Sequence, residues 1–258
     1  MFNKYIKYFI LIILILLMIP FGFSQNENPT SVSASDEDAF SEFEDEYHSE
    51  QAKSEVTTKY DPLFPYNRFM YHVNDRLYFI VLNPLAIYYN KIIPEKVRFG
   101  IRCFFKNVAF PIRFINNVLQ GRFKHAGVEV YRFAVNTTVG ILGIRDYATT
   151  KLHLAEYSED FGETLGHWGV GDGVPIVIPF FGFSNIRDAF GLLMDLVFLN
   201  PLARIKSTEA RALVFCFDKM NYISLHSGEY ETLKADALDP YTHLRDLYKQ
   251  DRDNKIKG

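Results

Sequence analysis

The chain has 258 residues, of which 48% are hydrophobic and 16% aromatic, and its formal net charge is −3. This length allows one large domain or two small ones. The weak charge excludes a nucleic-acid-binding protein that depends on a strongly basic surface, and two cysteines exclude a disulfide-stapled scaffold.

Residues 1–24 have the features of a secretory signal peptide. Two lysines precede a continuous apolar run over residues 9–19, and Gly22 and Ser24 follow it as small residues. The run is short for a bilayer span, so cleavage is favoured, with retention as a membrane anchor as the alternative. No cysteine follows the run, so we do not expect a lipid anchor there.

Residues 25–59 are expected to form an acidic, disordered linker. They contain ten acidic side chains, two lysines and few apolar residues, and such a segment cannot bury enough apolar surface to offset its chain entropy. The remainder of the chain is mildly basic, which suits anionic lipid headgroups. We expect a helical domain over residues 60–250 and a polar tail over 251–258.

Apolar residues at helical spacing predict a series of amphipathic helices and therefore an all-α fold. The first helix covers residues 67–82, and Asn83-Pro84 ends or kinks it. The next begins at Pro94 and carries Arg98 and other basic residues opposite its apolar stripe. Two positions are open for it, a membrane interface or the surface of a core. The expected apolar stripes are Phe69, Val73, Leu77 and Val81, then Val97, Ile101, Phe104, Phe105 and Val108, and then Ala126, Val130, Phe133 and Thr137.

Residues 159–191 are the most distinctive stretch of the chain. They hold the only tryptophan, Trp168, and seven of the fifteen glycines, six of them between Gly162 and Gly182. The uncharged run over 174–183 contains two prolines and is the one place where a small β-hairpin is expected. A proline-kinked, phenylalanine-rich run is unusual in a soluble enzyme and indicates lipid handling. Trp168 fits a membrane interface and a protein core equally well.

No complete catalytic or metal-binding set is found in the sequence. Ser184 stands in a motif that begins like a nucleophile elbow but lacks its closing glycine, so we interpret it as the cap of a helix starting near Ile186. Asp160, Glu163 and His167 have the helical spacing of a metal half-site. Because glycines interrupt that helix, we interpret them as polar residues that fix a turn. We therefore expect no enzyme activity, no metal and no cofactor.

The two cysteines, Cys103 and Cys216, each lie in an apolar helical pattern. Lone cysteines in such patterns are commonly core residues, so we expect two buried free thiols. A single bridge between them is the alternative.

A succession of short motifs over roughly residues 60–250 resembles the MlaA (VacJ) family. The motifs are Asp61-Pro62-Leu63, Tyr66-Asn67-Arg68, Asn116-Asn117-Val118-Leu119-Gln120-Gly121, the run from Glu159 to Gly166, Trp168-Gly169-Val170-Gly171, and Arg187-Asp188 followed by Gly191. The resemblance implies a ring-like bundle of amphipathic helices with a central channel, lying in the outer membrane at its periplasmic face.

The resemblance also implies a function and partners. The family removes mislocalised phospholipids from the outer leaflet of the outer membrane, passes them to a periplasmic lipid carrier, and associates with trimeric porins. Family members typically carry a cysteine directly after the signal. Because this chain lacks one there, its anchoring would depend on amphipathic helices or on a retained signal.

These expectations lead to two groups of candidate residues. Trp168, Gly169, Gly171 and Gly173 are candidates for a lipid channel, because glycine backbone bends and packs closely. Candidates for membrane contact are Ile176, Ile178, Phe180 and Phe181. Two other functions stay open, a membrane-peripheral scaffold that binds a porin or carrier without conducting lipid, and a lipid hydrolase, against which the missing nucleophile–base set argues.

Overall fold

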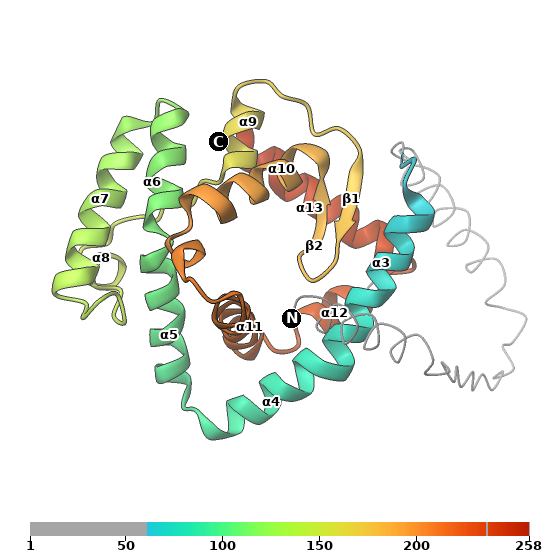
Figure 1. Cartoon of the computed structure of the whole chain (residues 1–258), viewed down its shortest axis with the longest axis horizontal. Coiled ribbons are helices and arrows are strands. Elements are labelled where there is room, and N and C mark those ends of the chain that lie inside the picture. The colour runs from blue at the N-terminus through green and yellow to red at the C-terminus, as the bar shows by residue number, and fades with distance from the viewer. Residues whose placement is uncertain (1–60, 236, 258) are drawn as a thin grey trace, which may run out of the picture. The chain divides into compact units, whose positions relative to one another are not determined.

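The computed structural model describes residues 61–235 and 237–257, so the expected signal peptide (1–24) and acidic linker (25–59) lie outside the described residues. The chain divides into two units, Met1–Pro62 and Leu63–Gly258, and all described helices and strands belong to the second. They are helices joined by turns and loops, with one two-stranded antiparallel hairpin (Figure 1). The all-α class with one small hairpin is thereby confirmed.

The helices and strands follow in this order. The first are α3 (Phe64–Leu77), the π-helical turn η1 (Tyr78–Leu82), α4 (Asn83–Ile92), α5 (Glu95–Val108), α6 (Phe110–Leu119), α7 (Phe123–Thr138) and α8 (Tyr147–Thr150). Then come α9 (Phe161–His167), β1 (Pro175–Ile178), β2 (Gly182–Asn185), α10 (Ile186–Met194), the π-helical η2 (Asp195–Leu199) and the 3₁₀ turn η3 (Pro201–Arg204). The last are α11 (Thr208–Leu225), α12 (Glu229–Ala235) and α13 (Pro240–Lys257).

Two asparagine–proline pairs follow the π-helical turns. Asn83-Pro84 directly follows η1, and Asn200-Pro201 directly follows η2. Proline lacks the N–H that a continuing α-helix requires, and a π-helical turn changes the hydrogen-bond pattern just before it. After Asn83 the chain continues as α4. No helix was expected from the sequence for these residues.

Side-chain amides of α3 hold the hairpin in place. Asn67 donates to the Pro175 carbonyl at 2.9 Å and accepts the Val177 N–H at 2.8 Å. Two helical turns further on, Asn74 donates to the Ile178 carbonyl and accepts the Phe180 N–H. The two amides satisfy backbone groups along the edge of β1 that would otherwise lack partners. Val177 packs with Tyr71, Tyr241 and Leu244 in the one cluster of buried apolar side chains found in the described residues.

Polar side chains fill most of the remaining interior, while large apolar side chains lie on the outside. In α5, Arg98 is 5% exposed and its neighbour Val97 is 51% exposed. Arg98 donates to the Ser224 carbonyl at 2.6 Å, and Asn221 donates back to the Arg98 carbonyl. The buried residues of α5 are Arg98, Gly100, Cys103 and Asn107, whereas its apolar stripe is exposed at Val97 and half-buried further along.

The same inversion occurs in α7 and α3. The buried face of α7 carries Glu129, Arg132 and Asn136 together with Ala126 of the expected apolar stripe, whereas Val130 of the same stripe is exposed. The buried residues of α3 are Asn67, Tyr71 and Asp75, whereas Phe69 is exposed. The expected positions of these helices agree with the structure, and the residues of their apolar stripes, apart from Ala126, are exposed or half-buried.

Helices α9 and α10 cross at a pair of glycines. A Cβ added at Gly191 would lie 2.3 Å from the backbone nitrogen of Gly162, a distance that leaves no room for a side chain. Figure 1 shows α9, α10 and α13 side by side. This close approach brings the start of α9 against residues of α10 and α13.

Two further expectations change. Residues 251–257, assigned from the sequence to a polar tail, belong to α13, and Arg252 is buried. Both cysteines are free, as expected, and Cys103 is buried. Cys216, however, is exposed on α11, because the apolar side of that helix is not its inward side.

Candidate functional site

A cavity of about 260 Å³ lies among the hairpin, α10, α11 and α13. We call it the hairpin cavity. Its apolar wall consists of Ile178, Phe181, Phe183 and Leu192. Its polar wall consists of Asp160, Ser184, Asp188, Asp195, Lys219, Tyr248 and Arg252. An apolar wall facing a charged wall is suited to an amphipathic molecule.

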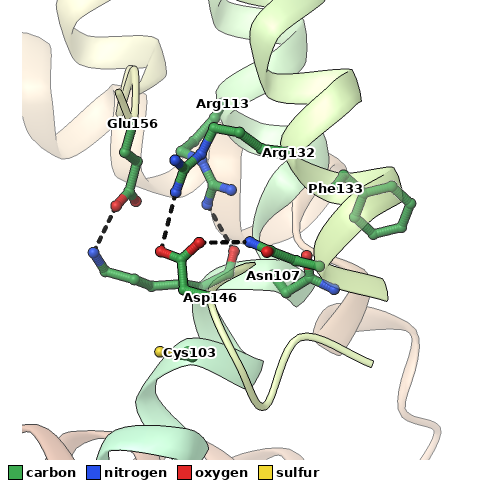
Figure 2. A pocket seen from close by; sticks show the side chains of 9 residues that line it. Cys103, Asn107, Arg113, Arg132, Phe133, Asp146 and Glu156 are labelled. Atoms are coloured by element: carbon green, nitrogen blue, oxygen red, sulfur yellow. Dashed lines mark hydrogen bonds and ion pairs between the residues drawn. The ribbon is translucent and has the colours of Figure 1, made fainter. Parts of the chain in front are cut away.

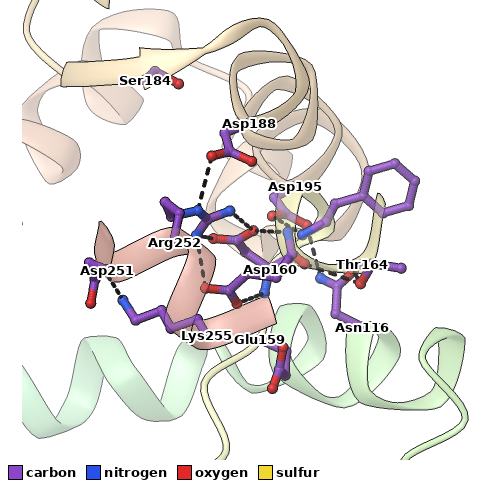
Figure 3. Close-up of polar contacts among 12 residues, drawn as sticks. Asn116, Glu159, Asp160, Thr164, Ser184, Asp188, Asp195, Asp251, Arg252 and Lys255 are labelled. Carbon is purple, nitrogen blue, oxygen red and sulfur yellow. Dashed lines mark hydrogen bonds and ion pairs between the residues drawn. The ribbon is translucent and has the colours of Figure 1, made fainter. Parts of the chain in front are cut away.

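Arg252 joins three elements at the polar wall (Figure 3). Its guanidinium donates to both Asp160 oxygens at 2.6 and 2.8 Å, to Glu163 at 2.8 Å and to Asp188 at 3.0 Å. Asp188 also accepts the Tyr248 hydroxyl at 2.9 Å and the Arg187 Nε–H at 2.8 Å. The contacts therefore tie α13 to the starts of α9 and α10.

Asp195 completes the group of carboxylates near the cavity. It accepts the Phe161 N–H at 2.9 Å and the Asn116 amide at 3.2 Å. No cation lies within 4.0 Å of it among the described residues. We call Asp160, Glu163, Asp188 and Asp195 the carboxylate cluster. Its four carboxylates contact only two guanidinium groups in the described part of the chain, so negative charge is in excess there.

Burial alters the protonation of two members of the cluster. Burial and the Asp160 carboxylate raise the pKa of Glu163 to about 8, although Arg252 opposes this rise. Burial also raises the pKa of Asp195 to about 6, against its hydrogen bonds from Phe161 and Asn116. For Asp188, burial raises the pKa, but the contacts with Arg187 and Arg252 outweigh it, and the pKa is lowered.

The segment with Asp160, Glu163 and His167 is a helix, α9, and not the turn that its glycines led us to expect, and its two acidic residues have a structural role. Asp160 accepts the Glu163 N–H at 2.8 Å, and Glu163 accepts the Asp160 N–H at 3.0 Å, which makes a capping box at the start of α9. His167 is exposed at the other end of the helix. The described residues hold no group of three or more ligand side chains placed to bind a metal.

The sequence led us to expect Ser184 as the cap of α10, but Ser184 does not have that role. Asn185 has that role, because its side chain accepts the Asp188 N–H at 2.8 Å. Ser184 lines the hairpin cavity instead. Asp146 caps α8 by accepting the Thr149 N–H.

The lipid-channel candidates lie apart from the residues that line the cavity. Trp168 is 54% exposed and donates from its indole nitrogen to the Leu119 carbonyl at 3.1 Å. Nothing in the described chain lies within 4 Å of a Cβ added at Gly169 or Gly171, and at Gly173 the nearest atom is in Ile186 at 3.4 Å. Gly169 and Gly173 have left-handed backbone angles, so glycine is required there by conformation.

The membrane-contact candidates divide into two groups. Phe180 and Phe181 are exposed at the hairpin turn, where Phe180 has a φ of 67°. Ile176 and Ile178 are half-buried on β1. Ile178 and Phe181 also line the hairpin cavity, so the turn borders both the cavity and the surroundings.

A second polar pocket lies between α5, α6 and α7. Figure 2 shows Arg132 directed at Asp146. Asn136 also donates to Asp146, and Lys106 donates to Glu156. Its volume is about 10 Å³, which is about the size of one water molecule. It therefore fixes the packing of these helices and is too small for a lipid headgroup.

Sequence reasoning did not single out the charged residues that matter most at the cavity. Asp195 and Lys219 each stand inside a mainly apolar run, and Arg252 stands in the presumed tail. For Asp195 and Lys219, the position of a charged residue within an apolar run was the signal that could have identified them. Among residues 61–235 and 237–257, no helix combines the length and the apolar character needed to cross a membrane.

Comparisons with known proteins agree on one family. Residues 59–255 match the model of the family described as MlaA lipoprotein. The chain is 35% identical over 204 residues to the intermembrane phospholipid transport system lipoprotein MlaA of Shigella flexneri, covering 77% of this chain and 79% of that protein. For the Haemophilus influenzae protein of the same name, the identity is 30%, covering 78% of this chain and 81% of that protein.

A solved structure is also similar. It is described as the structural basis for maintenance of bacterial outer membrane lipid asymmetry. It matches with a TM-score of 0.64 and 27% sequence identity, and the match covers 77% of this chain and all of the solved chain.

Proposed function

This chain belongs to the MlaA lipoprotein family, and on that premise we propose that it transports phospholipid between bacterial membranes. In this role it removes mislocalised phospholipids from the outer leaflet of the outer membrane and passes them to a periplasmic carrier, which maintains lipid asymmetry. The proposal is supported by the names of its relatives, which are components of a phospholipid transport system. The protein acts without catalysing a reaction.

The observation that carries the proposal is the inverted placement of polar and apolar side chains. Val97 and Phe99 of α5 are exposed, whereas Arg98 between them is buried. Exposed apolar side chains also lie along η1 and α4, namely Phe79, Ile80, Val81, Leu85 and Ile87. Contact of such a surface with water is unfavourable, whereas contact with lipid chains is not. The proposed location is therefore the periplasmic face of the outer membrane, with the helices partly embedded.

The hairpin cavity is the proposed path for lipid. Its apolar wall suits acyl chains and its charged wall suits a headgroup. The sequence-based channel candidates Trp168, Gly169, Gly171 and Gly173 do not line the cavity. They are proposed to border the lipid path where it continues beyond the cavity. A ring with a central channel, contact with a trimeric porin and contact with a periplasmic carrier stay part of the proposal.

Reconstitution tests the proposal. The full-length protein is placed in vesicles that contain phospholipid, a soluble periplasmic lipid carrier is added, and the lipid on the carrier is measured by mass spectrometry. We expect transfer to require the protein. Carrier binding to the vesicles without any lipid transfer would contradict the proposal and would support a scaffold role. Release of free fatty acid would identify a hydrolase instead.

A further inference from the structure

Lys219 is the one cation of the hairpin cavity wall that has no carboxylate contact among the described residues. Its ammonium lies 5.7 Å from the centre of the Phe215 ring, and no hydrogen bond or ion pair joins it to another described residue. Burial lowers the pKa of Lys219, against the opposing effect of Asp218. An ammonium held in such a place gains from an anionic partner entering the cavity.

The other cation of the wall, Arg252, already donates four of its five N–H groups to carboxylates. Its donors contact Asp160, Glu163 and Asp188, so it has little capacity left for a phosphate. Lys219 is therefore the available phosphate contact in the cavity.

The same wall also offers a carboxylate that can contact a cationic group. The Asp160 side chain is 42% exposed although Arg252 contacts both of its oxygens. The Asp188 side chain is only 4% exposed and is enclosed by Arg187, Tyr248 and Arg252. Because the carboxylate cluster has more carboxylates than guanidinium groups, Asp160 can accept hydrogen bonds from an additional cation.

We propose that the hairpin cavity selects phospholipids whose headgroup carries both a phosphate and a primary ammonium, with Lys219 contacting the phosphate and Asp160 contacting the ammonium. The inference rests on the proposed function and adds a headgroup preference to it. A net anionic headgroup without the ammonium would place uncompensated negative charge beside the carboxylate cluster. A quaternary ammonium would fill the space without donating a hydrogen bond to Asp160.

Competition between two natural headgroups tests the inference. The full-length protein is equilibrated with equal amounts of phosphatidylethanolamine and phosphatidylglycerol of identical acyl chains, and the retained lipid is measured by mass spectrometry. We expect about tenfold enrichment of phosphatidylethanolamine, the effect of one charge-assisted hydrogen bond. Asp160→Asn, which keeps a capping side chain at α9, should return the ratio towards one. Lys219→Gln should lower retention of both lipids at a nearly unchanged ratio.

A second variant keeps the test independent of the Arg252 contacts. Ser184→Lys adds an ammonium to the cavity wall and should lower the preference for phosphatidylethanolamine without removing any ion pair. Matched controls are Asp251→Asn and Lys255→Gln, because these residues form an exposed pair on α13 and should leave the ratio unchanged.

The outcomes separate the two proposals. Retention of both lipids in equal amounts by the unmodified protein would overturn the headgroup inference and leave phospholipid transport standing. Retention of neither lipid would overturn the proposed function as well. An unchanged preference in both Asp160→Asn and Ser184→Lys would show that the cavity wall does not select the headgroup.

Discussion

The Nε atom of Arg113 on α6 lies 2.7 Å from an oxygen of Glu129 on α7, and the Glu129 side chain is fully buried. The second Glu129 oxygen accepts the Tyr157 N–H at 2.9 Å and lies 3.6 Å from Arg132. A buried ion pair of this kind fixes how two helices face each other, because neither charge can turn into apolar surroundings.

Removing the charge of Glu129 should strongly destabilise the protein. Glu129→Gln leaves the Arg113 guanidinium buried without its counter-charge, and we expect a loss of about 3–5 kcal/mol in the free energy of unfolding. The control Asp251→Asn, in an exposed pair with Lys255, should cost less than about 1 kcal/mol. Chemical denaturation in detergent measures both, and equal midpoints for the two variants would contradict this account.

The crossing of α9 and α10 should not tolerate a methyl group. Gly191→Ala places a Cβ against the backbone of Gly162, so the helices must separate, at a cost of about 1–3 kcal/mol or more. Gly127→Ala is the matched control, since Gly127 lies within α7 with nothing within 4 Å of an added Cβ in the described chain. That change should stabilise by about 0.5–1 kcal/mol. The midpoint of thermal unfolding should therefore fall in Gly191→Ala and rise in Gly127→Ala. A shift in the same direction in both variants would refute the tight crossing.

The amide of Asn67 should protect the hairpin. Asn67→Ala removes the acceptor of the Val177 N–H and the donor to the Pro175 carbonyl. Loss of one such hydrogen bond should make the exchange of backbone amide hydrogens in the hairpin roughly fivefold to tenfold faster. Hydrogen–deuterium exchange of a peptide covering residues 175–185 measures it, with Asn90→Ala on the exposed side of α4 as the control. Equal exchange in both variants would show that α3 does not hold the hairpin.

The carboxylate cluster should make stability depend on pH. The pKa of Glu163 is about 8 in the folded protein against an ordinary value of 4.5. The folded state therefore binds a proton more tightly than the unfolded state, and this group's contribution to stability declines as the pH rises from about 4.5 to about 8. The pKa of Asp188 is lowered instead, so its contribution changes below this window.

Glu163→Gln isolates that effect, because glutamine also completes a capping box. Between pH 5 and pH 8, the midpoint of denaturation should fall more in the unmodified protein than in the variant. If both proteins lose the same stability over this interval, Glu163 does not hold a proton in the folded state.

The positions of the long helices α3, α5 and α7 could be predicted from the sequence, whereas α4, α9 and the sides that the helices bury could not. Helical periodicity locates the stripe of Val97 and Phe104 correctly, but periodicity alone does not say whether water, lipid or protein faces it. The usual assumption of an aqueous surrounding places Val97 inside, whereas the structure places Arg98 there. Polar residues at helical spacing, such as Glu129, Arg132 and Asn136 on α7, were the signal that favoured the inverted arrangement.

The hairpin was predictable and the cavity beside it was not. The proline-kinked run at 174–183 indicated the hairpin directly, since no other run in the chain has that pattern. The cavity, in contrast, combines Asp160, Lys219 and Arg252 from three helices that are distant in sequence. Such a combination depends on tertiary contacts, of which the Gly162–Gly191 crossing is one.

Blocking the hairpin cavity tests the central claim most directly. Leu192 lines the cavity and its neighbour Leu193 is exposed, so Leu192→Trp fills the path and Leu193→Trp adds the same bulk outside it. Lipid transfer from vesicles to a soluble carrier is measured for both, with folding checked by circular dichroism. We predict that Leu192→Trp stops transfer and Leu193→Trp does not. Transfer at the unmodified rate by folded Leu192→Trp protein would contradict the proposal that lipid passes through this cavity.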